Sequence, residues 1–239
     1  PSLLSSLDGG EGMVELFNLL GVDYVCFGNH EADVSHEALV QRIEQFEGVW
    51  LNSNMPDFEP HLPEHHVCEL LGPDGLPSGR VIAFVGLLIG GGANASLYRP
   101  ASFGGAAESI VPVLEAHRDV AACVHERHPG LSALVAITHQ DLPEDEALAA
   151  SGLYAAVLGG HDHFLHDGVV QVAGSGGCTQ SPTEHARHGT HSVPVVKAGM
   201  DASKAIVVEL SWAPGTPLGG PPSRSTTRVL EVGAYEQGQ

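Results

Sequence analysis

The sequence predicts an α/β protein in which helices flank two packed, mixed β-sheets. Two observations carry this prediction. Up to residue 160, apolar runs typical of buried strands alternate with amphipathic helical segments, which is the pattern of βαβ units. Beyond residue 160, strand-like runs follow one another without helices, and we expect them to form a second, meander-like sheet packed on the first. These runs are 169–172, 193–197 and 206–210.

The first half of the chain carries clear helix and strand signals. Apolar residues recur every three to four positions in 9–20 and 35–46, which predicts two helices, and Ser35 suits the N-cap of the second. Continuous apolar runs predict strands at 22–27, 49–54 and 81–88. The stretch 55–80 is rich in Pro, Gly and Asp, which indicates loop and hairpin.

The second half continues the alternation and then changes in composition. The longest helix is expected at 105–128, followed by a strand ending at Thr138, a short helix over 144–151 and a strand at 155–160. After residue 211 the chain is rich in Pro, Gly and Ser, which indicates a linker. We therefore predict one domain over 1–211 and a linker or tail over 212–239.

The composition excludes several classes of function. The 239 residues are 43% hydrophobic, which is enough for one domain with a substantial core. Only 10 Lys and Arg stand against 29 Asp and Glu, and the net charge is −19. Nucleic-acid binding needs a basic footprint, so we expect no nucleic-acid partner, and the same charge disfavours docking on anionic lipid. No apolar run reaches the length of a membrane span.

Polar motifs follow three of the predicted strands at the point where each strand ends. Gly28-Asn29-His30-Glu31 follows the first strand, His139 follows the strand that ends at Thr138, and Gly159-Gly160-His161-Asp162-His163 closes the strand at 155–160. Ligands bind at the carboxyl ends of the strands in open α/β sheets. Because Asn and His arrive together at that edge, the sequence predicts a metal site there.

The chemistry of these side chains indicates a hydrolase with two metals. Neutral imidazole and carboxamide oxygen suit zinc, manganese, iron or cobalt. His161 and His163 are two residues apart, so in an extended turn both can point the same way and reach adjacent metals. Two metals about 3.5–4 Å apart clamp a phosphate and activate water. His30, beside the proposed ligand Asn29, is the candidate acid for the leaving alkoxide.

Three blocks of the sequence together resemble the calcineurin-like metallophosphoesterase family, in particular its 5′-nucleotidase-type branch. They read GNHE at 28–31, THQD at 138–141 and GGHDH at 159–163. The segments PEDEALAAS at 143–151 and VPVVKAGMDASKAIVVEL at 193–210 extend the resemblance over about residues 1–211. It implies the metallophosphoesterase-like fold, a dinuclear centre of two divalent metal ions, and hydrolysis of small phosphomonoesters such as nucleotides.

The resemblance also implies roles for individual residues. Asn29, His139 and His161 would bind one metal, and His163 would bind the other. His30 would be the general acid and would contact the phosphate together with Asn29. Glu31 would orient the turn, whereas neither Asp162 nor Asp141 is expected as a ligand. A separate repeat, His185, His188 and His191, lacks a helical pattern, which argues against a third metal site.

The front of the chain departs from the family pattern. The Asp-x-His and Gly-Asp blocks, which carry the metal-bridging carboxylate, should precede GNHE, and no residue here fits them. The opening residues 1–5 resemble the segment that comes after the Gly-Asp block in this branch. We therefore expect an incomplete N-terminus and little activity from this chain alone. A C-terminal substrate-binding domain, as the branch implies, would lie beyond the chain.

Two alternatives stand beside a nucleotidase-like phosphomonoesterase. A phosphodiesterase or protein phosphatase would share the fold, although the Arg of the protein phosphatase pattern GNHE-x-R is missing after residue 31. A catalytically dead scaffold module would keep the fold without the reaction. Asp-x-His and Gly-Asp blocks encoded upstream would favour the enzyme, and their absence would favour the scaffold.

Overall fold

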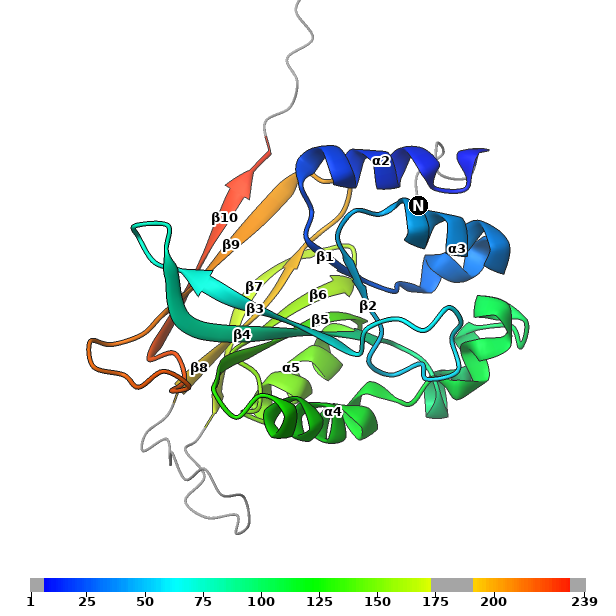
Figure 1. The fold of residues 1–239 in the computed structure, drawn as a ribbon. Coiled ribbons are helices and arrows are strands. Elements are labelled where there is room, and N and C mark those ends of the chain that lie inside the picture. Colours follow the sequence, from blue (N-terminus) through cyan, green and yellow to red (C-terminus); the bar gives the residue numbers. More distant parts are fainter. Residues whose placement is uncertain (1–6, 173–190, 233–239) are drawn as a thin grey trace, which may run out of the picture.

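A computed structural model describes residues 7–172 and 191–232. Its centre is a six-stranded sheet with the order β3-β4-β5-β6-β8-β7 (Figure 1). Strands β4, β5, β6 and β8 are parallel, whereas β3 and β7 run antiparallel at the two edges. The strands are β3 (His65–Leu71), β4 (Pro77–Leu88), β5 (Leu131–Gln140), β6 (Ala156–His161), β7 (Leu165–Val172) and β8 (His191–Ala198).

Two smaller sheets accompany the central one. A parallel pair joins β1 (Tyr24–Cys26) to β2 (Val49–Leu51), and an antiparallel pair joins β9 (Lys204–Ser211) to β10 (Arg224–Glu231). The α-helices are α2 (Glu11–Leu20), α3 (His36–Gln45), α4 (Val113–Arg127) and α5 (Leu142–Ala150). Shorter 3₁₀ turns are η1 (Asn29–Asp33), η2 (Gly92–Leu97) and η3 (Ser102–Ser109).

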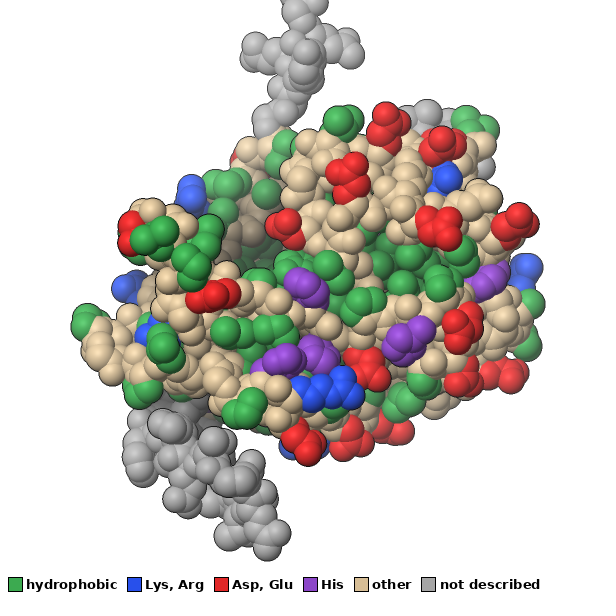
Figure 2. Space-filling view, in the orientation of Figure 1, with side chains coloured by type: hydrophobic (Ala, Val, Ile, Leu, Met, Phe, Trp, Pro, Cys, Tyr) green, Lys and Arg blue, Asp and Glu red, His purple; other side chains and the backbone are tan. Residues whose placement is uncertain are grey.

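Helices α4 and α5 lie against one face of the central sheet, while β1, β2, α2 and α3 lie on the other side (Figure 1). The molecular surface carries many acidic and few basic side chains on the face shown in Figure 2, in line with the net charge of −19. None of the helices in the described part of the chain is long and apolar enough to cross a membrane.

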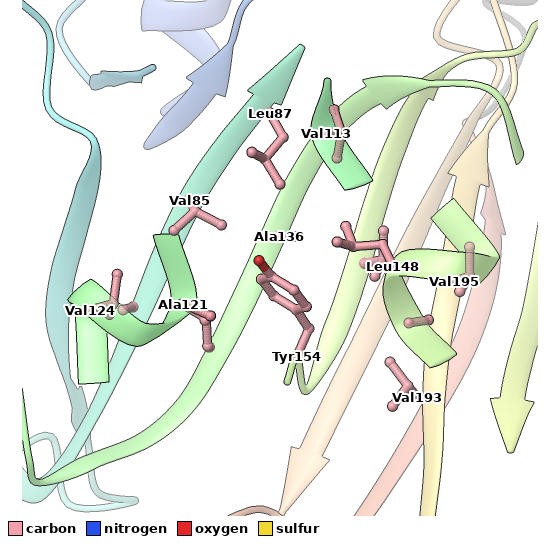
Figure 3. Packing of buried hydrophobic residues seen from close by; sticks show 14 of the residues in the cluster. Val85, Leu87, Val113, Ala121, Val124, Ala136, Leu148, Tyr154, Val193 and Val195 are labelled. Atoms are coloured by element: carbon pink, nitrogen blue, oxygen red, sulfur yellow. The ribbon is translucent and has the colours of Figure 1, made fainter. Parts of the chain in front are cut away.

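The main core fills the space between the central sheet and helices α4 and α5. Tyr154 is fully buried in the middle of this cluster, with Leu148 of α5 and Val195 of β8 close by (Figure 3). A second cluster of buried aromatic and aliphatic residues, including Phe27, lies around the segment after β1. The two cores therefore fix the strand ends where the polar motifs begin.

The α/β class with mixed sheets and flanking helices is confirmed. Helices α2 and α3 occur where the apolar spacing predicts them, and Ser35 caps α3 by accepting a hydrogen bond from the Ala38 amide at 3.2 Å. Strands β1, β4, β5 and β6 also lie within the predicted runs or extend them. Up to residue 160, the alternation of strand-like and helix-like spacings of apolar residues therefore located most of the elements.

Three elements differ from the sequence prediction. Strands β7 and β8 belong to the central sheet rather than to a second one, because the buried apolar run Val193–Val196 can pair with strands on both sides. The long helix begins at Val113, since residues 103–105 adopt positive φ and Pro112 takes the N-cap. By contrast, the loop and hairpin predicted for 55–80 are confirmed, because β3 and the start of β4 form an antiparallel pair there.

The C-terminal stretch predicted as a linker or tail also contains a strand. Residues 212–223 are mostly loop, but β10 pairs with all of β9 from Arg224 to Glu231. The β-branched residues Thr226, Thr227 and Val229 favour a strand, and the Pro/Gly signal of the preceding loop concealed it. The boundary at residue 211 stays a prediction. The histidines His185 and His188 lie outside the described residues.

Candidate metal centre

Two neighbouring strands and one turn bring the sequence motifs together at a single edge of the central sheet. His139 of β5 pairs in register with Gly160 of β6, and Gln140 pairs with His161. Parallel strands end at the same edge, so the two histidines become neighbours there. The η1 turn after β1 brings Asn29 to the same place.

The donor atoms of three side chains converge on one point. Oδ1 of Asn29 lies 2.7 Å from Nε2 of His139, and Nδ1 of His161 lies 3.3 Å from the same Nε2. Ligands of a tetrahedral zinc-type ion sit about 2.0–2.2 Å from it, which places them roughly 3.3–3.5 Å from one another. The 3.3 Å separation of the two histidine nitrogens matches that spacing, whereas the 2.7 Å contact to Asn29 is a hydrogen bond that a shared cation would have to widen.

The protons of the cluster follow from its hydrogen bonds. A carboxamide oxygen can only accept, so Nε2 of His139 must carry the proton that it shares with Asn29. Nδ1 of His161 then presents a lone pair to the same proton, and its Nε2–H faces Oδ1 of Asp141 at 3.5 Å. One proton thus holds two acceptors together, and a divalent cation in its place would satisfy all three donors.

Burial keeps His139 in the neutral form that a metal ligand needs. Removal from water lowers the pKa of its imidazole to about 3, and the nearby charges of His161, Lys197, His30 and His163 act in the same direction. A ring with that pKa is a neutral imidazole, with a single N–H, throughout the physiological range. The site therefore offers lone pairs and not a competing positive charge.

Gly28 lets the η1 turn approach His139 closely. A Cβ atom at this position would lie 2.9 Å from Cε1 and 3.0 Å from Nδ1 of the His139 ring. Separations that short do not occur between real side chains, so any larger residue would displace either the turn or the imidazole. The glycine of the GNHE block is thus explained by the lack of space beside a candidate ligand.

Glu31 orients the turn, as the sequence predicts. Its Oε2 accepts a hydrogen bond from the Gly28 amide at 2.5 Å, which closes the turn onto its own start. The carboxylate is buried, and this burial raises the pKa of Glu31 above its ordinary value. The residue holds Asn29 and His30 in place and does not itself reach the donor cluster.

His30 is paired with a carboxylate that the sequence analysis did not single out. Nδ1 of His30 lies 2.6 Å from Oδ2 of Asp33, and both side chains are partly exposed to solvent. An acidic residue three positions after the candidate acid, at the end of a short turn, is the signal that could have identified Asp33. The pairing fixes the ring and leaves Nε2 for another partner.

The structure places His163 and Asp141 outside the trio of Asn29, His139 and His161. His163 is exposed after β6 and, among the described residues, it makes no hydrogen bond or ion pair. Asp141 is no ligand in the sequence analysis, yet its carboxylate faces the outer nitrogen of His161. A carboxylate behind a ligand histidine fixes the ring and its tautomer. His163 is therefore separate from the trio, and Asp141 supports it.

Within residues 7–172 and 191–232, no group of three or more His, Cys, Asp or Glu side chains is arranged to hold a metal ion. The converging trio consists of two histidines and the carboxamide of Asn29, so a third charged or imidazole donor is what it lacks. The described residues thus bring together the three side chains predicted for one metal, and His163 lies apart from them.

Comparison of the whole chain with known proteins identifies its fold. No family model matches the sequence, and no curated protein is detectably similar to it. Solved structures do match, with the 5′-nucleotidase precursor from Thermus thermophilus at a TM-score of 0.71 and 15% identity over 96% of this chain. The NAD nucleotidase from Haemophilus influenzae matches at a TM-score of 0.70 and 16% identity over 96% of the chain.

A third match supplies the name of the fold. The calcineurin-like phosphoesterase YfkN from Bacillus subtilis superposes with a TM-score of 0.64 and 14% identity over 91% of this chain. The chain has the calcineurin-like phosphoesterase fold. It spans 66% of the length of YfkN and 43% and 44% of the two nucleotidases.

The calcineurin-like phosphoesterase fold explains why the motifs meet at the sheet edge. In this chain the ends of β5 and β6 and the turn after β1 are adjacent because the parallel order β4-β5-β6 places them so. The sequence resemblance to that family, which rests on three short blocks, therefore agrees with the fold found from the whole chain.

Proposed function

We propose that this chain is the metal-binding core of a phosphoester hydrolase that acts on small phosphomonoesters, with nucleotides as the first substrates to test. The observation that carries the proposal is the convergence of Asn29 Oδ1, His139 Nε2 and His161 Nδ1 at separations of 2.7 and 3.3 Å. This convergence occurs at the strand ends of a fold shared with phosphoesterases and nucleotidases.

The residues present fit a borderline divalent cation. Two imidazole nitrogens and a carboxamide oxygen suit zinc, manganese, iron or cobalt, and the depressed pKa of His139 keeps its lone pair available. Such ions, when bound, supply Lewis-acid polarisation of the phosphate and an activated water. Asn29, His139 and His161 would hold the first ion, and His163 would contribute to the second.

His30 is suited to the proton transfer. Asp33 holds Nδ1, which leaves Nε2 to deliver a proton to the oxygen of the departing alkoxide. Because η1 carries both Asn29 and His30, the acid lies directly beside the proposed metal site. Asn29 and His30 would also contact the phosphate through their donor groups.

The second ion needs ligands beyond those that the described residues supply. A catalytic zinc-type ion usually has three protein ligands, and His163 provides one. We therefore propose that the chain by itself binds one ion well and hydrolyses phosphomonoesters slowly at best. A non-catalytic module of the same fold is the alternative that this incomplete second site favours.

A titration of the metal-free chain with Mn²⁺ tests the first half of the proposal. We expect one tight site per molecule in the wild type and its loss in His139→Ala, since that substitution removes the donor at the centre of the trio. Equal binding by both proteins would contradict the assignment.

The gene upstream of Pro1 tests the second half. In-frame Asp-x-His and Gly-Asp blocks should add the missing ligands, and a chain extended by them should bind two ions and hydrolyse an aryl phosphate and AMP. An extended chain with both blocks that binds two ions and hydrolyses neither substrate would contradict the hydrolase and support the non-catalytic module.

A further inference from the structure

A lysine is buried directly beneath the candidate metal centre. The side chain of Lys197, on β8, is fully excluded from solvent. Four oxygen atoms surround its Nζ, at 2.7 Å for the Gln140 carbonyl, 2.6 Å for the Gly160 carbonyl, 2.7 Å for Asp145 Oδ2 and 3.0 Å for Asp162 Oδ2. Buried ammonium groups are rare and need such partners, so this arrangement is specific to the site.

The partners of the ammonium flank the two candidate ligand histidines in the chain. Gln140 directly follows His139, whereas Gly160 and Asp162 directly precede and follow His161. Lys197 therefore holds the backbone of both strand ends at once. It joins β5 and β6 at the residues next to the ligands, beyond the regular hydrogen bonds of the sheet.

Asp145, on α5, completes the connection on the β5 side. Its Oδ1 accepts hydrogen bonds from Thr138 Oγ1 at 2.6 Å and Gln140 Nε2 at 2.8 Å, so the carboxylate braces the residues before and after His139. Its Oδ2 pairs with Lys197. The carboxylate and the ammonium together form one network that reaches both ligand histidines.

The space taken by this network explains the first glycine of GGHDH. A Cβ at Gly159 would lie 2.4 Å from Asp145 Oδ2 and 3.0 Å from Lys197 Nζ, so no side chain fits there. The Asp145–Lys197 ion pair therefore requires glycine at position 159, in the same motif that carries the candidate ligand His161.

His161 needs such support because its own backbone is unfavourable. It adopts φ +75°, in the left-handed region that few residues other than glycine populate. Residues held in this region at functional sites persist when their surroundings fix them. The ammonium holds the carbonyl of Gly160 on one side and the carboxylate of Asp162 on the other.

We propose that Lys197 is a positioning residue for the metal centre, whose buried ammonium sets the backbone of His139 and His161 so that their ring nitrogens converge. The proposal rests on the proposed function only in taking these histidines as ligands. The positioning itself is a property of the metal-free chain and can be measured there.

The test compares two double variants that differ in whether the side chain at position 197 carries a polar group able to donate hydrogen bonds. Removing Lys197 would leave Asp145, whose side chain is fully buried, as an uncompensated charge, so Asp145→Asn accompanies each change. Asp162 keeps its carboxylate in both double variants, because its side chain reaches solvent, and its effect is therefore common to both. In K197M/D145N the donor to the two carbonyls is lost. In K197Q/D145N a carboxamide can still donate to the carbonyls of Gln140 and Gly160. Val193→Ala, a cavity in the core on the same strand, controls for loss of stability.

Amide hydrogen exchange of the metal-free proteins gives the first readout. We expect exchange in the segments 138–142 and 159–163 to be at least tenfold faster in K197M/D145N than in wild type, and closer to wild type in K197Q/D145N. Val193→Ala should not accelerate these segments more than the rest of β8. Unchanged exchange in K197M/D145N would overturn the positioning role.

The affinity for Mn²⁺ gives the second readout. The variant His139→Ala measures how much Mn²⁺ binds to histidines outside the proposed site, and this binding is subtracted. K197M/D145N should bind Mn²⁺ at least tenfold more weakly than wild type. Val193→Ala should bind Mn²⁺ as wild type does when both proteins are measured below their Tm. Equal weakening in Val193→Ala and K197M/D145N would mean that Lys197 only stabilises the fold. A wild type without the Mn²⁺ site would contradict the proposed function, and the exchange result would still decide the positioning role.

Discussion

Oδ1 of Asn29 lies 2.7 Å from Nε2 of His139, although 110 positions separate the two residues in the chain. The contact joins the turn after β1 to the end of β5 and defines the point on which His161 also converges. The two buried clusters hold the strand ends in place and so keep this contact in position. The contact is therefore the structural basis of the proposed metal centre.

Asn29 and His30 should fail differently when each is replaced by Ala. Asn29→Ala removes a donor, so Mn²⁺ affinity should fall by more than about 100-fold, the upper end of what losing an outer-shell partner costs. His30→Ala should retain the metal and lower kcat by roughly 10²–10⁴-fold, as the loss of a general acid does. Metal titration and turnover of an aryl phosphate, in a form of the protein that is active, measure the two effects. Equal metal loss in both variants would be inconsistent with the role given to His30.

Asp33→Asn should lower kcat with little change in metal affinity. The carboxamide has the same size but no charge, and it can turn a donor toward Nδ1 of His30, which spoils the alignment of the ring. We expect a loss in kcat of up to about 100-fold. Glu37→Gln, an exposed carboxylate on α3, is the matched control and should leave kcat unchanged. An Asp33→Asn protein with the kcat of wild type would mean that Asp33 does not orient His30 for proton transfer.

Gly28→Ala should weaken Mn²⁺ binding without touching a ligand. The added Cβ would lie 2.9 Å from Cε1 of His139, so the ring or the turn must move. A displaced ligand costs roughly 10-fold in metal affinity, comparable to the loss of an outer-shell partner. Gly130→Ala is the control, since nothing lies within 4 Å of a Cβ there. Calorimetric titration of both variants measures the difference, and unchanged affinity in Gly28→Ala would show that the site tolerates the shift.

His117 should make the free energy of unfolding fall as the pH drops below about 6.5. Its ring is buried on α4, and burial, with a smaller effect of Arg118, lowers the pKa of His117 from 6.5. On unfolding the ring takes up a proton that the folded state excludes, so stability is present above pH 6.5 and is lost as the pH falls toward the folded pKa.

His117→Leu should therefore flatten this dependence by up to about 1.4 kcal/mol per pH unit. Urea unfolding between pH 7.5 and 5 gives the slope for wild type and variant. His61→Leu, which replaces an exposed histidine in a loop, should keep the wild-type slope. If both variants and the wild type share one slope, buried His117 does not contribute.

The sequence alone was enough to predict most of the elements up to residue 160 and the meeting of three motifs. The strands that precede Asn29, His139 and His161 were recognisable from apolar runs. The parallel order of β5 and β6 brings His139 and His161 together, and the turn after β1 brings Asn29 to them. Their role as ligands stays a prediction. The resemblance to the calcineurin-like family was carried by short blocks, and the fold of the whole chain agrees with it.

The features that the sequence did not predict depend on contacts through space. Strand β10 was missed because a Pro/Gly-rich loop precedes it. The place of β8 in the central sheet was missed because its own residues do not show which strand it pairs with. Lys197 and Asp145 are 52 positions apart, and only the fold shows that they pair beneath the histidines. A lysine within a run of valines was the one local sign that a buried charge needed a partner.

Anomalous diffraction from crystals of the chain grown with Mn²⁺ tests the proposed metal centre most directly. We predict a peak about 2.0–2.3 Å from Asn29 Oδ1, His139 Nε2 and His161 Nδ1, at the point where their lone pairs converge. The same peak should be missing in His139→Ala crystals grown under identical conditions. A Mn²⁺ ion bound elsewhere, with the three side chains still hydrogen-bonded to one another, would contradict the assignment of these residues as ligands.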